Sequence, residues 1–365
     1  MKRKFRIVNY LVTFLTTMAL AIFTILYCGE KYSVVLKDII LPYILGLIIA
    51  GFFCALFHEL GHLVFGKANG FELISLTVWF LCWRKQGKNF KFSFTFNMEE
   101  AGSTEMVKKQ NVDVEKGLKK MTLGGLIFSF LSMLIGLLAI FVVMPYFVYC
   151  LVSVFLPVGA YFFFGNAIPS SENSVRNDGG VLYGLRKKDD QTKVLLSILA
   201  VQTELYNGKT FSEIDDKFYF DVPQLPEDSV YFIMLLNYRY NYYLDKSDYE
   251  QAKRVTQRLL SLEEYMPKSF NLPIKMDALY NYCTFDFDAN KADEIMYEIE
   301  GPINKLNFVT ATRVKLAYIL YVKKEKRYLE SFYNKGKKEA NMSQLKGLKV
   351  FERKLLDQIK DDFNK

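Results

Sequence analysis

Two histidines and a glutamate form a group whose residue types and spacing could carry out chemistry. His58 and His62, the only histidines among the 365 residues, are four positions apart, and Glu59 directly follows the first. Residues four apart lie on one face of an α-helix, so both imidazoles can bind a single Zn²⁺. Glu59 lies beside them and can take a proton from a water molecule that the metal activates. The pattern therefore predicts a hydrolytic zinc site.

The surrounding segment favours a metal site over a structural pair of core histidines. His58 follows the apolar run Ile39–Phe57, which we expect to continue as a helix to about Phe65. Ionisable side chains inside or beside the hydrocarbon of a membrane are costly unless they are paired or functional. A metal ligated by both histidines removes that cost, whereas a core histidine pair leaves it.

The chain divides by composition into an apolar first half and a charged second half. Residues 1–180 contain 17 Lys and Arg and 11 Asp and Glu, and the rest contains 30 and 28. The mean hydropathy of +0.07 is far too high for a disordered chain. The net charge of +8 does not indicate nucleic-acid binding, because its excess lies mostly beside apolar runs, where basic residues set membrane orientation. We expect a membrane domain followed by a soluble domain.

Four apolar stretches approach the length of about 20 residues that a bilayer-spanning helix needs. The first also fits a signal peptide, but the run is long and no clear cleavage site follows, so we expect a retained span. Lys and Arg are dense before the first span and between the second and third, which predicts a multi-pass protein of the cell membrane with both termini cytoplasmic. The stretches are Ile7–Tyr27, Ile39–Phe57, Met121–Met144 and Pro145–Ile168.

A catalytic zinc site usually has a third protein ligand and leaves the fourth position to water. No histidine remains, so we expect an acidic ligand, and Glu172 and Asp178 both follow the fourth span. Asp178 precedes two glycines, which allow a close approach of the backbone. The five cysteines are scattered without a close pair, so their spacing predicts neither a disulfide framework nor a cysteine-based zinc site.

These motifs together resemble the site-2 protease family of intramembrane zinc metalloproteases. That family carries His-Glu-x-x-His in the first helix of a three-helix core and Asn-x-x-Pro…Asp-Gly in the third. Here His58–His62 is followed two spans later by Asn166-Ala-Ile-Pro169 and then by Asp178-Gly179. The resemblance covers roughly residues 35–185, without the PDZ-like domain that many members insert between core helices.

The resemblance implies a role for each matching residue. His58, His62 and Asp178 would be the ligands of one Zn²⁺ per chain, Glu59 the general base, and Asn166 a substrate-binding residue. The implied activity is hydrolysis of a peptide bond in or near the membrane. The implied substrate is a membrane-inserted protein or peptide, such as a signal-peptide remnant, a peptide signal or a membrane-held regulator.

Two features modify this comparison. The polar insertion Ser170–Asn177 is longer than the corresponding segment of many members, so we expect Asp178 on a loop at the membrane surface and keep Glu172 as the alternative ligand. Gly124 and Gly125 resemble the small-residue patch of the family's second core helix, and close helix packing explains these glycines equally well.

The segment between the second and third spans predicts a β-hairpin close to the metal. Phe71–Phe80 and Lys91–Phe96 are rich in β-branched and aromatic residues, the latter alternates strictly, and Arg84–Lys88 is expected to form the turn. One hypothesis is that an edge strand of this hairpin pairs with an extended substrate. The alternative is a hairpin that rests on the bilayer surface.

The second half predicts helices separated by polar breaks. Their pairs recur with a loose period of about 34–45 residues, which is typical of α-hairpin repeats of the tetratricopeptide kind. The aromatic stripe Tyr231–Tyr243 is interpreted as core between repeats. The expected helices are Ser229–Leu244, Ser247–Tyr265, Ile274–Phe285, Lys291–Glu300, Phe308–Lys323, Lys326–Ala340 and Leu345–Phe363.

The sequence therefore predicts an α-helical polytopic membrane protein: an N-terminal transmembrane helix (1–34), a metalloprotease core (35–185) and a cytoplasmic all-α helical-repeat domain (186–365). The expected partners are a membrane-associated substrate, the lipid bilayer and a cytoplasmic protein bound by the repeats, with no nucleic acid. The alternative function is a membrane-anchored binding or immunity protein whose helical repeats carry the function. A membrane-tethered zincin that cuts soluble peptides is disfavoured by the apolar run before His58.

Overall fold

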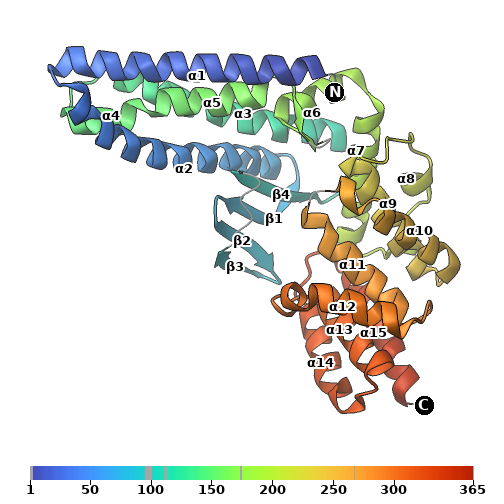
Figure 1. Ribbon diagram of the computed structural model, residues 1–365. Coiled ribbons are helices and arrows are strands. Elements are labelled where there is room, and N and C mark those ends of the chain that lie inside the picture. The colour runs from blue at the N-terminus through green and yellow to red at the C-terminus, as the bar shows by residue number, and fades with distance from the viewer. Residues whose placement is uncertain (1–2, 95–100, 111–112, 173–174, 267, 365) are drawn as a thin grey trace. The chain divides into compact units, whose positions relative to one another are not determined.

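The computed structural model describes residues 3–94, 101–110, 113–172, 175–266 and 268–364. Most of them are helical, and the chain forms two compact units (Figure 1). The first unit comprises Met1–Lys85, Phe90–Lys108 and Val112–Thr192, and the second comprises Gln86–Asn89, Lys109–Asn111 and Lys193–Lys365.

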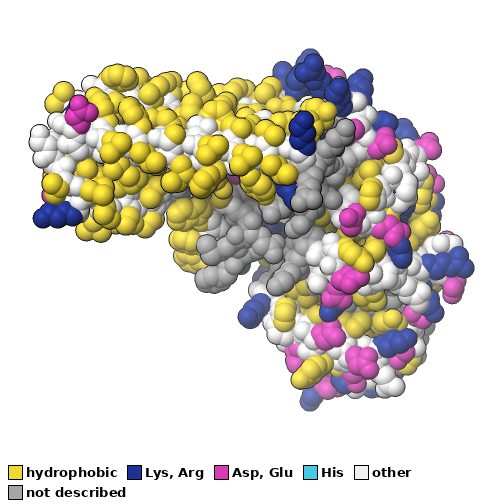
Figure 2. Space-filling model, turned by 45° about the horizontal axis from the view of Figure 1, so that its top comes forward, with side chains coloured by type: hydrophobic (Ala, Val, Ile, Leu, Met, Phe, Trp, Pro, Cys, Tyr) yellow, Lys and Arg dark blue, Asp and Glu magenta, His cyan; other side chains and the backbone are white. Residues whose placement is uncertain are grey.

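Among the described residues, four helical segments of the first unit are long and apolar enough to cross a membrane, which is consistent with the predicted helical membrane protein. Figure 2 shows apolar side chains gathered over the visible face of this bundle. Large apolar side chains of these helices are exposed, such as Phe14 and Leu41, which are 62% and 67% exposed. Such a surface is unfavourable in water and suits lipid. The helices are α1 (Arg3–Tyr32), α2 (Leu36–Ala68), α3 (Val114–Ala139) and the pair α4 (Tyr146–Ser153) and α5 (Phe155–Ala167).

The third and fourth spans differ in detail from the predicted boundaries. The helix α3 runs from Val114 to Ala139 and so begins earlier and ends earlier than the apolar stretch does. The fourth span consists of two helices, because Pro157 has no N–H to donate to the carbonyl of Ser153 and the helix breaks between them.

The helices α2 and α3 approach each other closely at two facing glycines. A Cβ atom on Gly61 would lie 2.2 Å from the carbonyl oxygen of Gly124, and one on Gly124 would lie 2.3 Å from that of Gly61. Small residues of this kind let helices pack backbone against backbone in a membrane. The packing brings the histidine-bearing turn of α2 against the first half of α3.

The loop between α2 and α3 folds into a four-stranded sheet of order β3-β2-β1-β4, rather than the single hairpin that the sequence predicts. Trp79 adopts a left-handed conformation (φ 52°) in a tight turn that reverses the chain into β2, a strand the sequence analysis does not name. The predicted turn Arg84–Lys88 is shorter in the structure and lies at Gly87 and Lys88. The last two residues of the predicted strand Lys91–Phe96 fall outside the described residues. The strands are β1 (Phe71–Val78), β2 (Leu81–Gln86), β3 (Asn89–Phe94) and β4 (Gly102–Lys108).

The second unit is helical, and each of the helices predicted after residue 228 is present with its ends within six residues of the prediction. Its aromatic stripe is core, as predicted: Tyr231, Tyr240 and Tyr242 are all buried. The sequence analysis names no helix between residues 181 and 228. The structure has three there: the end of α6 (Asp178–Lys187), α7 (Asp190–Asn207) and the short α8 (Lys217–Phe220). The helices are α7 (Asp190–Asn207), α8 (Lys217–Phe220), α9 (Val230–Asp245), α10 (Tyr249–Ser261), α11 (Lys268–Cys283), α12 (Ala289–Asn304), α13 (Val309–Ala317), α14 (Leu329–Ala340) and α15 (Lys346–Asn364).

The core of the second unit contains buried charged groups. Arg313 Nε lies 2.7 Å from Glu352 Oε2, and both side chains are buried. Nearby, Asp277 accepts a hydrogen bond of 2.9 Å from Asn237 Nδ2. Burial raises the pKa of Asp277 to about 7, although the positive charge of Arg313 and the hydrogen bond from Asn237 act in the opposite direction.

The raised pKa of Asp277 predicts that the second unit loses stability as the pH rises. The folded state keeps a proton that the unfolded chain releases above about pH 4, so the free energy of unfolding falls between about pH 4 and pH 7. Asp277→Asn removes this dependence and should raise the unfolding midpoint at pH 8 by several degrees. The unfolding midpoint is measured by proteolysis of the full chain during a thermal ramp at pH 5 and at pH 8. Asp361→Asn, which changes an exposed residue, is the control. Equal midpoints for wild type and Asp277→Asn at pH 8 would contradict the prediction.

Candidate metal centre

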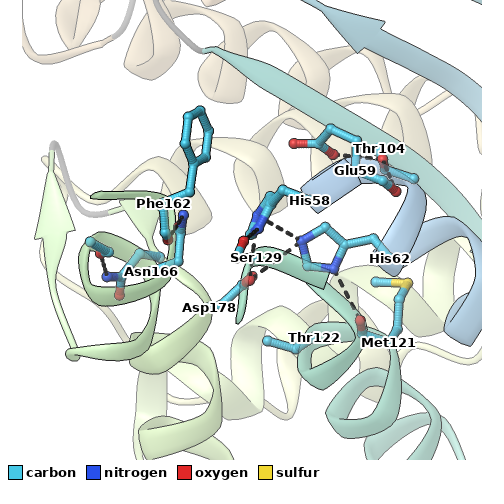
Figure 3. A network of polar contacts seen from close by, with 12 residues as sticks. His58, Glu59, His62, Thr104, Met121, Thr122, Ser129, Phe162, Asn166 and Asp178 are labelled. Atoms are coloured by element: carbon cyan, nitrogen blue, oxygen red, sulfur yellow. Dashed lines mark hydrogen bonds and ion pairs between the residues drawn. The ribbon is translucent and has the colours of Figure 1, made fainter. Parts of the chain in front are cut away.

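Three potential ligand atoms converge where α2, α3 and α6 meet (Figure 3). His58 and His62 lie one turn apart on α2, and their Nε2 atoms are 3.2 Å apart. Oδ2 of Asp178 lies 3.5 Å from Nε2 of His58 and 3.4 Å from Nε2 of His62. The structure therefore brings together the three residues that the motif resemblance implies as metal ligands.

The outer nitrogens of both imidazoles are held by α3. His62 Nδ1 lies 3.0 Å from the carbonyl oxygen of Met121, and His58 Nδ1 lies 2.8 Å from Oγ of Ser129. A carbonyl only accepts, so Nδ1 of His62 carries the proton and its Nε2 presents a lone pair toward Asp178. Metal-binding histidines almost always make such a second hydrogen bond, which fixes the orientation of the ring.

The residues present fit a divalent cation. Oδ2 of Asp178 is buried and makes no hydrogen bond, and it faces the lone pair of His62. Burial raises the pKa of Asp178 to about 8, because the charged carboxylate loses its contact with water. A cation between these acceptors would satisfy them, and two imidazole nitrogens with one carboxylate oxygen form a donor set typical of catalytic zinc.

Asp178 is the first residue of the helix α6, and not part of a loop as the sequence analysis expects. The polar insertion before it forms a two-stranded hairpin, β5 (Ser171–Glu172) and β6 (Val175–Arg176), so the chain returns to the end of α5 before α6 begins. Asn177 caps α6 by accepting a hydrogen bond from the backbone N–H of Gly180 at 2.9 Å. Glu172, the alternative ligand, lies in β5, and its side chain falls outside the described part of the chain.

Gly125 lines the site directly. A Cβ atom there would lie 2.4 Å from Cε1 and 2.5 Å from Nε2 of His62, and 3.0 Å from Oδ2 of Asp178. Its neighbour Gly124 instead faces Gly61 in the helix packing. The two glycines of the motif thus have different roles, one in helix packing and one in leaving space at the site.

Glu59 is buried on the side of α2 that contacts the sheet. Its Oε2 accepts a hydrogen bond of 2.6 Å from Oγ1 of Thr104 in β4 (Figure 3), and a Cβ on Gly102 would lie 2.8 Å from its Oε1. Among the described strands β4 is an edge of the sheet. The strand beside Glu59 is therefore β4, a strand that the predicted hairpin does not include. The described part of the predicted strand Lys91–Phe96 belongs to β3, at the opposite edge of the sheet. The sequence analysis missed Thr104, because β4 shows little alternation of polar and apolar residues.

Asn166 lies in α5, and its amide Nδ2 donates a hydrogen bond of 3.0 Å to the carbonyl of Phe162, one turn earlier. The ring of Phe162 lies 6.3 Å from that of His58, centroid to centroid. Since residues four apart share a helix face, Asn166 belongs to the face of α5 that passes His58.

Comparison of the chain with protein-family models, with curated proteins and with solved structures gave no significant match. The assignment of a function therefore depends on the geometry of the site and on the motifs that form it.

The space at Gly125 predicts that its substitution weakens metal binding. In Gly125→Ala the new methyl group would overlap the ring of His62, so Zn²⁺ affinity should fall by at least about tenfold, the range seen when a ligand loses its orientation. Zinc content per chain and competition with a chelator measure this. Gly301→Ala in α12 is the control, because a Cβ there would meet nothing within 4 Å. Unchanged zinc affinity in Gly125→Ala would place the metal elsewhere.

Proposed function

We propose that this protein is an intramembrane zinc metalloprotease that hydrolyses a peptide bond in or near the membrane of a membrane-inserted protein or peptide. The observation that carries the proposal is the convergence of His58, His62 and Asp178 within a bundle of apolar helices. The resemblance of their motifs to the site-2 protease family supports the same function.

The chain's own residues have separate tasks in the proposed reaction. His58, His62 and Asp178 would hold Zn²⁺, which when bound polarises the scissile carbonyl and makes a nearby water more acidic. The carboxylate of Glu59 takes the proton of the attacking water and returns it to the leaving amine. Thr104 fixes the orientation of that carboxylate through its hydrogen bond to Oε2.

We propose that the substrate binds in extended form along β4. This strand pairs with β1 on one side, is an edge of the sheet among the described strands, and contacts the general base. Edge strands bind extended peptides through backbone hydrogen bonds. Asn166, on the face of α5 that passes His58, is proposed to hold the substrate from the other side.

The second unit is proposed to be a cytoplasmic helical-repeat domain that binds a protein partner. Neighbouring helices along the chain pack on one another, α9 on α10, α11 on α12 and α13 on α14, as α-hairpin repeats do. The first helices of these pairs begin at Val230, Lys268 and Val309, which is a regular spacing. Both chain termini are assigned to the cytoplasm from the distribution of Lys and Arg.

The mechanism predicts different defects for the base and for a ligand. Glu59→Gln should keep zinc but lower turnover by about 10²–10⁴-fold, the contribution of general base catalysis, whereas His58→Ala should lose both. Sequencing of small peptides and new N-termini from cells with wild type, Glu59→Gln or no protein identifies the cleavage products. Products confined to wild type and cut within or beside an apolar segment would support the protease.

Identical products with wild type and Glu59→Gln would sink the catalytic proposal. Suppose that loss of the whole protein changes the cells but Glu59→Gln does not. If deletion of residues 193–365 then had the same effect as loss of the whole protein, a membrane-anchored binding protein would be the better description.

The contact of Glu59 with β4 predicts a role for a hydroxyl at position 104. Thr104→Val keeps the shape of the side chain but removes the hydrogen bond, so kcat should fall by about tenfold or more, the weight of a hydrogen bond to a charged group. Thr104→Ser keeps the hydroxyl and should stay close to wild type. Both rates are measured as the formation of a cleavage product that the sequencing experiment identified, at equal zinc content. A valine variant as active as the serine variant would show that this hydrogen bond is not used.

A further inference from the structure

The apolar helix α1 contains a buried asparagine that reaches the end of α5. Asn9 is only 4% exposed, and its Nδ2 donates to the carbonyls of Gly165 at 2.9 Å and Ile168 at 2.7 Å. A polar side chain inside a membrane-spanning helix is costly unless it satisfies another polar group there. Asn9 therefore has a specific partner at the end of α5.

The same two carbonyls are bound from the other side by Asn177. Its Nδ2 donates to the carbonyls of Gly165 at 2.6 Å and Ile168 at 2.8 Å. Its Oδ1 accepts from the backbone N–H of Ser170 at 2.8 Å and of Gly180 at 2.9 Å. Asn177 thus uses both donors and both acceptors that an asparagine side chain has.

Pro169 explains why the end of α5 needs these donors. In a continuing helix the carbonyl of Gly165 would accept from the backbone N–H four residues later, and Pro169 has none. The last carbonyls of any helix lack partners within it. Asn9 and Asn177 supply two donors to each of the carbonyls of Gly165 and Ile168, and we call this pair of side chains the amide clamp.

The amide clamp determines where α6 begins. Asn177 is bonded directly to Asp178, and Gly179 packs so closely on α5 that a Cβ there would lie 2.2 Å from the carbonyl of Ala167. A rotation or shift of Asn177 would therefore carry the carboxylate of Asp178 away from the imidazoles, which lie 3.4–3.5 Å from it. The position of this carboxylate depends on hydrogen bonds made by α1 and by the residue before α6.

We infer that Asn9 and Asn177 are positioning residues that jointly hold Asp178 in place to bind the metal, so that α1 is part of the metal centre. This inference rests on the proposed function, because it takes Asp178 as a ligand. It makes metal binding depend on α1, a helix outside the three-helix core. It also explains Pro169 of the Asn-x-x-Pro motif, which leaves the carbonyl of Gly165 free to accept from the two asparagines.

Metal binding by the purified full chain in detergent tests the amide clamp. Co²⁺ is the spectroscopic probe, since its visible absorption reports the geometry and number of ligands, and competition with a chelator gives the Zn²⁺ affinity. The test variants are Asn9→Leu and Asn177→Asp. Asn177→Asp keeps the oxygen that caps α6 and binds Ser170, but it loses the amide donors, so it separates the amide clamp from the cap.

Both variants should bind Zn²⁺ about 10- to 100-fold more weakly, the usual effect of removing a group that orients a ligand, and should change the Co²⁺ spectrum. Thr13→Val is the matched control, because Thr13 is also buried in α1, one turn after Asn9, and its hydroxyl makes no hydrogen bond. It should match wild type in both measurements. Asp178→Asn provides the spectrum of a site without the third ligand.

Wild-type affinity and spectrum in both test variants, with weakened binding in Asp178→Asn, would overturn the amide clamp and leave the proposed function standing. Wild-type binding in Asp178→Asn would instead remove Asp178 as a ligand, and with it both proposals. If Asn9→Leu fails to fold, Asn177→Asp decides alone, because α6 keeps its cap in that variant.

Discussion

The burial of the Asp178 carboxylate against two imidazole nitrogens is the constraint on which the rest of the membrane unit depends. Moving an ionised carboxylate out of water costs several kcal/mol even after the protein relaxes around it. Here its Oδ2 also faces the lone pair of His62 at 3.4 Å, so the two groups repel rather than compensate each other. A divalent cation bound between these acceptors would turn both contacts into attractions.

The surrounding structure holds these acceptors together from three sides. The facing glycines 61 and 124 let α2 and α3 approach until Met121 and Ser129 reach the outer nitrogens of the histidines. The amide clamp fixes the third side by determining the start of α6. Helix packing, ring orientation and carboxylate position therefore act together, and a change in any of them would separate the three candidate ligand atoms.

The helix α2 also relates the metal centre to the sheet. Consecutive residues of an α-helix point about 100° apart, so His58 faces α3 while Glu59 faces β4. Glu59, the proposed base, is thereby held by a different element from the one that orients the two histidines, the proposed ligands. In the proposed function, a peptide lying along β4 would pass Glu59, which Thr104 of that strand contacts.

Local patterns in the sequence determined much of this protein. Hydropathy identified the four spans, and the spacing of His58, Glu59 and His62 predicted their placement on a single helix, because helical periodicity depends on neighbouring residues alone. Helices of the second unit were likewise predicted from local apolar periodicity. The motif resemblance selected Asp178, whereas residue chemistry by itself left Glu172 open.

The tertiary structure decided what depends on residues far apart in the chain. β4 is a strand because it pairs with β1, although its own sequence shows little alternation. Asp178 begins a helix because Asn177 caps it and is itself held at the end of α5. The sequence analysis does not single out Asn9, and only its hydrogen bonds to the end of α5 indicate a use for it. Spacing along a sequence encodes the face of a helix, but it does not encode which distant carbonyl that face will meet.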